Sequence, residues 1–278
     1  MRGGMLLELS SLQNPKVKAA LKLNDRRERN RSGLFIIEGF RELSRAVAGS
    51  VSIQTLFYCP SLFLGSNEPA LIEKIRSQGA EVISCHPQVF EKLSYRDRPD
   101  GLLAIAVQMK QTLEDLDRAL EGVAHPFIVV AEAIEKPGNL GTILRSADAA
   151  GVDAVIVCDR CTDIYNPNVV RASVGTLFTL PVVEASSEET LNFLRAKQIR
   201  IAAATPSAKE MFTEAQLSQS IAIAVGTEQL GLTKTWMDAA DLQVRIPMHG
   251  VADSLNVATA TTLLLYEVLR QRQERTWM

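Results

Sequence analysis

The sequence predicts an α/β protein of two domains, and three observations support this prediction. The chain has 278 residues, which is nearly twice a common domain size. Short apolar runs alternate with segments of helical composition along most of its length. In the second half of the chain these runs are apolar on both faces, which is typical of parallel strands that helices cover on both sides.

The composition limits the class of protein further. Hydrophobic residues make up 46% and charged residues 22% of the chain, which excludes a disordered or collagen-like protein. No apolar run is long enough to cross a bilayer, and the first residues lack the apolar core of a secretory signal. Four cysteines and three histidines do not suggest a disulfide scaffold or a His-rich metal site. We therefore expect a cytoplasmic protein with no membrane partner and no metal.

The first domain is expected to span residues 1–108 and to form a small α/β unit. Apolar runs predict four strands, at residues 34–37, 53–58, 81–84 and 102–107. Composition and plausible helix starts predict helices between them, at residues 41–48, 69–77 and 87–93. The polar residues 109–124 are expected to form a linker that contains a short helix.

The net charge of −2 conceals a basic segment near the N-terminus. Residues 14–31 carry seven cations against two carboxylates, a local charge of +5. Such a patch suggests a docking surface for a polyanion, while a solvated helix followed by a mobile loop explains the same charges. Phosphate contacts from this surface would give affinity without sequence readout. The candidate residues for these phosphate contacts are Lys16, Lys18, Lys22, Arg26, Arg27, Arg29, Arg31 and Arg41.

The second domain, residues 125–278, is expected to contain the parallel sheet. The predicted strands are residues 127–131, 154–158, 180–183, 199–203, 221–225 and 242–246. The predicted helices include residues 142–150, 187–197 and 233–239. A last helix, at about residues 254–272, is apolar over a wide arc, which is typical of a helix buried in a core or in a subunit interface. This arc comprises Val257, Ala260, Thr261, Leu263, Leu264, Leu265 and Val268.

Open α/β sheets bind ligands beyond the carboxyl ends of their strands, and three loops of the second domain are expected there. The first loop, residues 135–145, contains two glycines that permit close approach to a ligand, and the amide of Asn139. Arg145 is expected about one turn into the following helix, facing back toward the loop. The loop matches neither the dinucleotide-binding nor the nucleoside-triphosphate-binding glycine motif.

The second and third loops also place polar residues beyond strand ends. Gly226 and Glu228 follow the strand at residues 221–225, although a plain turn with an exposed glutamate is an alternative. In the third loop, Asp253 and Ser254 are residue types that cap helix N-termini well. Capping does not explain Asn256, which is expected in the first turn beside free backbone N–H groups.

Together these loops resemble the SpoU (TrmH-like) family of S-adenosylmethionine-dependent RNA ribose methyltransferases, within the SPOUT superfamily. The matching segments are residues 135–151, 226–232 and 246–258, and they occur in the family's order. Residues 14–41 likewise resemble the ribosomal-protein-like RNA-binding domain that many members carry. One departure is Gln229 and Leu230, where many members have smaller or more polar residues.

The resemblance implies a C-terminal domain with a deep trefoil knot, a homodimer, and S-adenosylmethionine bound beside the dimer interface. By the resemblance, backbone groups of five residues hold the cofactor: Thr205, Gly226, Ile246, Met248 and Leu255. The residues that it implies at the reacting centre are Asn139, Arg145, Glu228, Ser254 and Asn256. The methyl group of a sulfonium is already activated, so the reaction needs alignment and removal of a proton but no metal.

These residues are given distinct roles. By the resemblance Arg145 activates the ribose hydroxyl, but arginine is protonated at physiological pH. We therefore interpret Arg145 as a phosphate clamp that stabilises a developing alkoxide, and leave the proton acceptor open. Asn139 and Asn256 are interpreted as orienting groups, Ser254 as part of the same network, and Glu228 as an anchor for the loop.

The expected function is methyl transfer to a ribose 2′-hydroxyl, with ribosomal RNA favoured over transfer RNA because a separate N-terminal domain suits a large structured substrate. The alternatives are a transfer RNA 2′-O-methyltransferase and a non-catalytic RNA-binding module in ribosome assembly. A dinucleotide-dependent oxidoreductase shares the α/β alternation but lacks the glycine motif. The nucleotide that is modified does not follow from the sequence.

Three further features are given ordinary interpretations. Cys158 and Cys161 have Cys-x-x-Cys spacing, but without a second pair or a nearby histidine we expect two plain thiols. His249 is expected in a loop near the cofactor. Residues 166–171 resemble a capped helix start, and Arg171 is either part of that helix alone or a contact to RNA.

Overall fold

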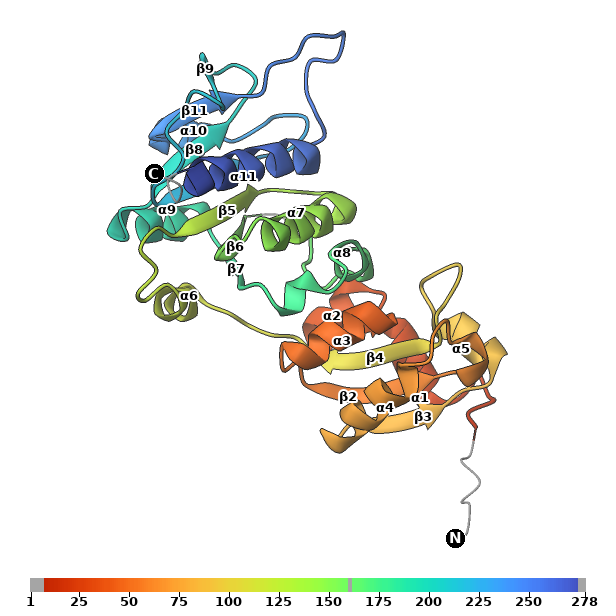
Figure 1. Cartoon of the computed structure of the whole chain (residues 1–278). Coiled ribbons are helices and arrows are strands. Elements are labelled where there is room, and N and C mark those ends of the chain that lie inside the picture. The colour runs from red at the N-terminus through yellow and green to blue at the C-terminus, as the bar shows by residue number, and fades with distance from the viewer. Residues whose placement is uncertain (1–7, 160–161, 275–278) are drawn as a thin grey trace. The chain divides into compact units, whose positions relative to one another are not determined.

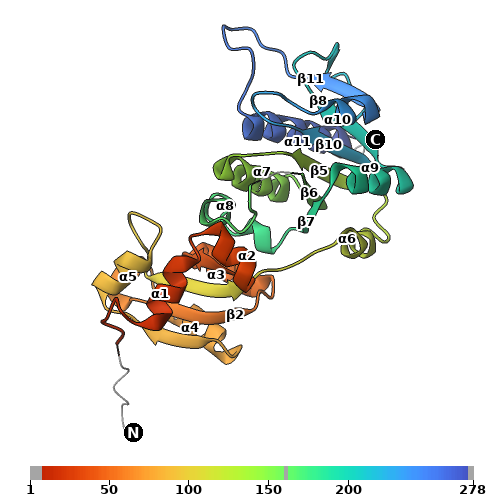
Figure 2. The same ribbon diagram turned by 180° about the vertical axis from the view of Figure 1, so that it is seen from behind.

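The computed structural model describes residues 8–159 and 162–274. The chain divides into two compact units (Figures 1 and 2). Unit 1 consists of Met1–Met109 and Asp163–Thr179, and unit 2 of Lys110–Thr162 and Leu180–Met278. Among the described residues, no helix is long and apolar enough to cross a membrane.

Unit 1 is built on a mixed four-stranded sheet of order β1-β4-β2-β3. In it β4 runs antiparallel to β1 and β2, and β3 runs parallel to β2. The strands are β1 (Leu34–Glu38), β2 (Ile53–Tyr58), β3 (Glu81–Ser84) and β4 (Leu102–Val107). The first helices are α1 (Pro15–Lys22), α2 (Arg26–Ser32), α3 (Phe40–Ala48), η1 (Pro60–Leu62), α4 (Glu68–Ser77) and α5 (Pro87–Leu93). All strands and helices predicted between residues 34 and 107 are confirmed to within one residue.

The basic segment forms two helices, so the predicted mobile loop after the first helix is wrong. The side chain of Asn14 accepts a hydrogen bond from the second residue of α1 at 2.9 Å, and Asp25 does the same for α2 at 2.6 Å. Both are good N-cap residues because their side-chain oxygens satisfy free N–H groups of the first turn. Gly33 ends α2 with a φ of 67° that favours glycine.

A later segment of the chain completes unit 1. α8 (Pro167–Ala172) packs against β1, and η2 (Thr176–Phe178) packs against α3. The ring of Phe35 on β1 lies 4.6 Å from that of Tyr165 and 5.9 Å from that of Phe178. The capped helix start predicted at residue 166 is confirmed, since the side chain of Asn166 accepts a hydrogen bond at the start of α8. Unit 1 is therefore not a contiguous stretch of sequence.

Unit 2 contains a seven-stranded sheet of order β7-β6-β5-β10-β8-β11-β9, in which every neighbouring pair is parallel. The predicted parallel sheet is confirmed. Its strands are β5 (Phe127–Glu132), β6 (Ala154–Cys158), β7 (Val182–Ala185), β8 (Arg200–Ala204), β9 (Glu210–Met211), β10 (Ile221–Val225) and β11 (Leu242–Arg245). Its helices are α6 (Leu113–Ala119), α7 (Pro137–Ala149), α9 (Ser187–Ala196), α10 (Lys234–Ala239) and α11 (Val257–Glu274).

Helices cover both faces of this sheet. On one face α6, α9 and α10 enclose a core that includes Leu116, Leu194 and the fully buried Trp236. On the other face α7 and α11 pack side by side over β6 and β10 (Figures 1 and 2). Leu116 on α6 is 1% exposed, so the predicted linker helix belongs to the core of unit 2.

The last helix is buried over most of the predicted arc. Val257, Thr261, Leu264, Leu265 and Val268 are at most 8% exposed. The exceptions are Ala260, which is partly exposed, and Leu263, which is 41% exposed.

Candidate active site

A cavity of about 410 Å³ lies beyond the carboxyl ends of β8, β10 and β11, against the start of α11. Strand ends contribute apolar walls such as Val225 and Val244, and α11 contributes Leu264. All five residues predicted to hold the cofactor line this cavity: Thr205, Gly226, Ile246, Met248 and Leu255. The structure thus brings together positions that are up to 50 residues apart in the sequence.

Gly226 is required because the loop after β10 folds back onto the strand end. A Cβ atom at Gly226 would lie 2.2 Å from the carbonyl oxygen of Gly231, far inside van der Waals contact. Reciprocal backbone hydrogen bonds between Thr227 and Gly231, of 3.0 and 3.1 Å, close the loop. A side chain at Gly226 would therefore displace the loop that carries Glu228.

The residues that line the cavity fit S-adenosylmethionine. Its volume falls in the range of about 300–1,000 Å³ that is typical of small-molecule sites. Among the described lining residues there are two carboxylates, Glu228 and Asp253, and no lysine, arginine or histidine. A sulfonium cation is favoured next to carboxylates, and apolar walls suit an adenosine group.

Glu228 is the centre of a hydrogen-bond network at the mouth of the cavity. Its Oε1 accepts hydrogen bonds from Asn139 Nδ2 at 3.0 Å and from Asn256 Nδ2 at 2.6 Å. Its Oε2 accepts a hydrogen bond from Lys136 Nζ. Hydrogen bonds from Lys136 and Asn139 hold the pKa of the Glu228 carboxyl below its ordinary value. Glu228 is thus an ionised acceptor that joins α7, the loop after β10 and α11.

Asn139 lies in a helix and not in a loop. α7 begins at Pro137, five residues before the predicted start, because proline is well suited to the first helical position, where its missing N–H is not needed. Asn139 therefore lies in the first turn of α7, from which its side chain reaches Glu228. The predicted loop at residues 135–145 is corrected accordingly.

Asn256, and not Ser254, caps the last helix. Asn256 Oδ1 accepts hydrogen bonds from the backbone N–H of Ala258 at 3.0 Å and of Thr259 at 3.4 Å. The helix begins at Val257, so the predicted start at residue 254 is wrong. Because Asn256 Nδ2 donates to Glu228 and to Asn139 Oδ1, one side chain both caps α11 and joins the network. Ser254 is exposed and lines the cavity.

Arg145 does not join the hydrogen-bond network of Glu228. Its side chain is exposed on α7, lies outside the cavity lining and makes no ion pair with the described residues. Arg145 is two turns into the helix, because the helix begins earlier than predicted. His249 is exposed in the loop after β11 and does not line the cavity.

Sequence reasoning missed Glu132, at the carboxyl end of β5. Its side chain is 1% exposed and accepts hydrogen bonds from Thr233 N at 2.8 Å and Thr233 Oγ1 at 2.6 Å. Thr233 precedes α10 and closely follows the loop of Glu228. Glu132 therefore fixes the far end of that loop. The sequence signal that could have identified Glu132 is its position as a carboxylate directly after an apolar run.

Comparison with known proteins identifies the domain that forms this site. The model of the SpoU rRNA Methylase family matches residues 126–266, about half of the chain. The chain belongs to the SpoU rRNA methylase family. In this SpoU methylase, residues 14–104 also match the model of the MRM3-like substrate binding domain.

Relatives of this SpoU methylase match over nearly the whole chain. A 23S rRNA (uridine(2479)-2′-O)-methyltransferase from Streptomyces viridochromogenes is 34% identical over 90% of this chain and 87% of the relative. The 23S rRNA (guanosine(2553)-2′-O)-methyltransferase RlmP of Bacillus subtilis is 27% identical over 94% and 98%. The crystal structure of an AdoMet-bound rRNA methyltransferase from Sinorhizobium meliloti has a TM-score of 0.85 and 30% identity, with 96% of this chain and 99% of that chain covered.

Unit 1 of the SpoU methylase exposes seven of the eight predicted RNA-binding cations. Arg29 is 1% exposed, pairs with Asp163 at 2.6 Å and donates to two backbone carbonyl groups. The prediction that Arg29 contacts RNA is therefore wrong. Lys16 pairs with Glu81, and Arg31 pairs with Glu28. The remaining predicted cations are exposed: Lys18, Lys22, Arg26, Arg27 and Arg41.

Metal ligands do not cluster in the part of the SpoU methylase that the structure describes. Within residues 8–159 and 162–274 there is no group of three His, Cys, Asp or Glu side chains that could hold a metal. Cys158 is buried, with its Sγ 3.2 Å from Thr190 Oγ1, and Cys161 lies outside the described residues.

Proposed function

We propose that this SpoU methylase transfers the methyl group of S-adenosylmethionine to a ribose 2′-hydroxyl of ribosomal RNA. The observation that carries this proposal is the cationless cavity of about 410 Å³ that opens beside the Asn139–Glu228–Asn256 network. Relatives named 23S rRNA 2′-O-methyltransferases and an AdoMet-bound neighbour support the same substrate and cofactor. Since the substrate is ribosomal RNA, we place the protein in the cytoplasm.

In this mechanism backbone groups around the cavity hold the cofactor, namely those of Thr205, Gly226, Ile246, Met248 and Leu255. When bound, S-adenosylmethionine supplies an activated methyl group. The protein then has to bring the ribose hydroxyl into line with that group and stabilise the charge that develops on its oxygen. Alignment of this kind accounts for much of the rate in reactions between two bound partners.

Asn139 and Asn256 are proposed to orient the ribose, and Glu228 to hold both amides in place. Glu228 is poorly suited to take the proton, because both its oxygens already accept hydrogen bonds and its pKa is lowered. Ser254 extends the network at the cavity wall. Arg145 is proposed to bind a phosphate of the substrate and to stabilise the developing alkoxide, because its guanidinium group stays protonated at physiological pH.

The proposed RNA surface on unit 1 comprises Lys16, Lys18, Lys22, Arg26, Arg27, Arg31 and Arg41. Phosphate contacts from these residues would supply affinity that falls as the salt concentration rises. Such contacts position an RNA without reading its sequence.

We also propose that unit 2 carries the trefoil knot of SPOUT proteins and that the protein acts as a homodimer. Leu263 and Tyr266 are 41% and 48% exposed on one side of α11, whereas Leu264 and Val268 are buried. Apolar side chains that gather on an exposed helix face are typical of a contact surface. Light scattering tests the dimer, and Leu263→Lys combined with Tyr266→Lys is expected to produce a monomer.

The experiment that tests the proposed function is transfer of tritium from labelled S-adenosylmethionine to RNA from a strain that lacks this gene. One labelled 2′-O-methyl site in ribosomal RNA is the expected result. Label in transfer RNA would instead identify a transfer RNA methyltransferase. Absence of both label and cofactor binding, with free ribosomal RNA and with ribosomal particles, would refute the proposal in favour of a non-catalytic RNA-binding module.

A further inference from the structure

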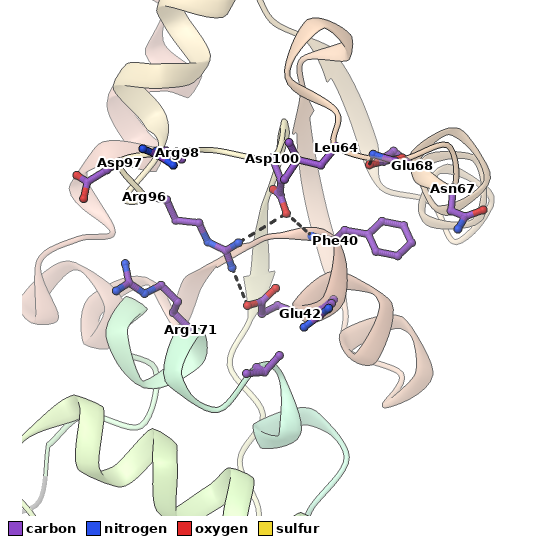
Figure 3. A pocket seen from close by; sticks show the side chains of 13 residues that line it. Phe40, Glu42, Leu64, Asn67, Glu68, Arg96, Asp97, Arg98, Asp100 and Arg171 are labelled. Atoms are coloured by element: carbon purple, nitrogen blue, oxygen red, sulfur yellow. Dashed lines mark hydrogen bonds and ion pairs between the residues drawn. The ribbon is translucent and has the colours of Figure 1, made fainter.

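We propose that a cavity in unit 1 is an RNA phosphate site, in which Arg41, Arg98 and Arg171 bind the backbone of the substrate RNA. This inference rests on the proposed function, because it takes RNA as the substrate. The cavity has a volume of about 840 Å³. Its walls come from the first turn of α3, the segment before α4, the loop before β4, and α8 (Figure 3).

Most of the carboxylates that line this cavity are buried, whereas most of its arginines are exposed. Three of its carboxylates are buried: Glu42 is 5%, Asp100 8% and Glu68 3% exposed. Glu42 and Asp100 both pair with Arg96, at 2.6 and 3.6 Å (Figure 3). Glu68 accepts a hydrogen bond from the backbone of Gly65 at 2.8 Å. Each buried carboxylate therefore has at least one protein donor, although Glu68 Oε2 and Asp100 Oδ1 accept no hydrogen bond within the described residues.

The cations at the surface of the cavity are not engaged in this way. Arg41, Arg98 and Arg171 are exposed and make no ion pair within residues 8–159 and 162–274. The one exposed carboxylate of the lining is Asp97. The solvent-facing part of the cavity thus carries three guanidinium groups against one carboxylate. Guanidinium groups bind phosphate oxygens in bidentate geometry, so this arrangement suits a phosphodiester.

Arg96 fixes the relative positions of two segments that carry these cations. Besides its ion pairs, Arg96 donates a hydrogen bond to the carbonyl oxygen of Glu38 at 2.8 Å. Gly39 makes room for it: a Cβ at this position would lie 2.4 Å from a terminal nitrogen of Arg96, and Gly39 has a φ of +113°. Glu38 also accepts hydrogen bonds from Ser94 and from the backbone of Tyr95. The loop that carries Arg98 is thereby joined to the start of α3, the helix that carries Arg41.

The third cation is joined to the same loop. Arg171 lies on α8, and Asn168 on that helix donates a hydrogen bond to the hydroxyl of Tyr95 at 2.8 Å. Tyr95 is 43% exposed and Leu64, on the cavity lining, is 82% exposed. Apolar and aromatic surfaces beside guanidinium groups suit unpaired bases next to a phosphate. These features favour a stretch of RNA with accessible bases over an isolated phosphate ion.

Two charge-matched triple variants test the proposal. The first is Arg41→Gln, Arg98→Gln and Arg171→Gln. The control is Lys74→Gln, Arg76→Gln and Lys92→Gln, which removes the same charge from exposed positions of unit 1 outside the cavity. All six side chains are exposed, so thermal unfolding is expected to stay unchanged in both variants. Binding to deproteinised ribosomal RNA is measured against salt concentration, and S-adenosylmethionine binding is measured without RNA.

The cavity variant is expected to bind ribosomal RNA roughly 100-fold more weakly and to lose about two units from the slope of log affinity against log salt. The control variant is expected to lose far less, and both are expected to bind S-adenosylmethionine like the wild type. Equal RNA affinities and slopes in the two variants would overturn the proposal. So would tight binding of uridine monophosphate by the cavity with RNA affinity unchanged, since that result identifies a small-molecule site.

Failure of this inference and failure of the proposed function give different results. If the wild type methylates ribosomal RNA and both variants bind it equally, the cavity proposal is refuted and the proposed function stands. If the wild type binds ribosomal RNA through these arginines but transfers no methyl group to any RNA, the cavity proposal is supported and the proposed function is refuted.

Discussion

Substitutions at Asn256 can separate the stability of the last helix from the geometry of the active site. Asn256 Oδ1 caps α11, while Asn256 Nδ2 donates to Glu228 and Asn139. Asn256→Ala removes both interactions. Asn256→Ser keeps an oxygen that caps helices well, but its side chain is too short to reach Glu228. The two variants therefore differ in capping and agree in the loss of the network.

The expected magnitude follows from the cost of a lost cap. Replacing a capping side chain by alanine costs about 1 kcal/mol, within a range of about 0.5–2 kcal/mol. For a chain of this size that corresponds to a fall in Tm of roughly 2–4 °C. We expect this fall for Asn256→Ala and a Tm near the wild-type value for Asn256→Ser. Both variants remove the hydrogen bond from Asn256 to Glu228, and a displacement of about 1 Å at a reacting centre can cost roughly 100-fold in rate.

The assays are thermal unfolding and methyl transfer to ribosomal RNA. Ser254→Ala is the control for unfolding, because it removes the hydroxyl that the sequence favours as the cap, and its Tm is expected to be unchanged. An Asn256→Ser variant that unfolds as early as Asn256→Ala would refute the capping argument. An Asn256→Ser variant with full activity would refute the argument that Asn256 positions the site.

Three other perturbations have defined outcomes. Arg145→Ala is expected to lose most of kcat while calorimetry finds S-adenosylmethionine binding near the wild-type value; unchanged turnover would exclude the phosphate clamp. Arg29→Met leaves the buried Asp163 carboxylate uncompensated, so the free energy of unfolding in urea should fall by about 3–5 kcal/mol. Adding Asp163→Leu should restore most of it, and a double variant no more stable than the single one would contradict this account. The hydrogen bonds that lower the pKa of Glu228 from 4.5 favour the folded state above that pH, and this contribution is lost as pH falls through the lowered pKa. Lys136→Met should therefore raise the pKa of Glu228 toward 4.5 in an NMR titration of its carboxyl carbon, whereas an unchanged pKa would show that Lys136 does not cause the shift.

The elements of this fold could be predicted well where burial is local and periodic. The strands at Ile221–Val225 and Ala154–Cys158 are buried along their whole length, so an apolar run marks both ends. The start of α7 was predicted too late because Gly138, Asn139 and Gly141 are residue types typical of loops. Pro137 was the better signal, since proline favours the first position of a helix.

The remaining site features depend on contacts that no local pattern contains. Asp253, Ser254 and Asn256 are all good capping residues. The one that caps α11 is Asn256, which also donates a hydrogen bond to Glu228. The burial of Arg29 depends on Asp163, which lies 134 positions later in the chain. A basic segment therefore looked uniformly exposed in the sequence, although one of its arginines belongs to the core.

Unit 1 consists of two separate segments of the chain, so it can be completed only late in synthesis. β4 ends at Val107, but Asp163, Tyr165 and Phe178 are added only after the whole of β5, α7 and β6 has been translated. Until then Arg29 has no carboxylate partner and the ring of Phe35 has no aromatic neighbours. We expect a truncated product that stops at residue 109 to be easily digested by proteases. Exchange of substrate-recognition modules between related enzymes would accordingly have to transplant residues 163–179 together with the N-terminal part.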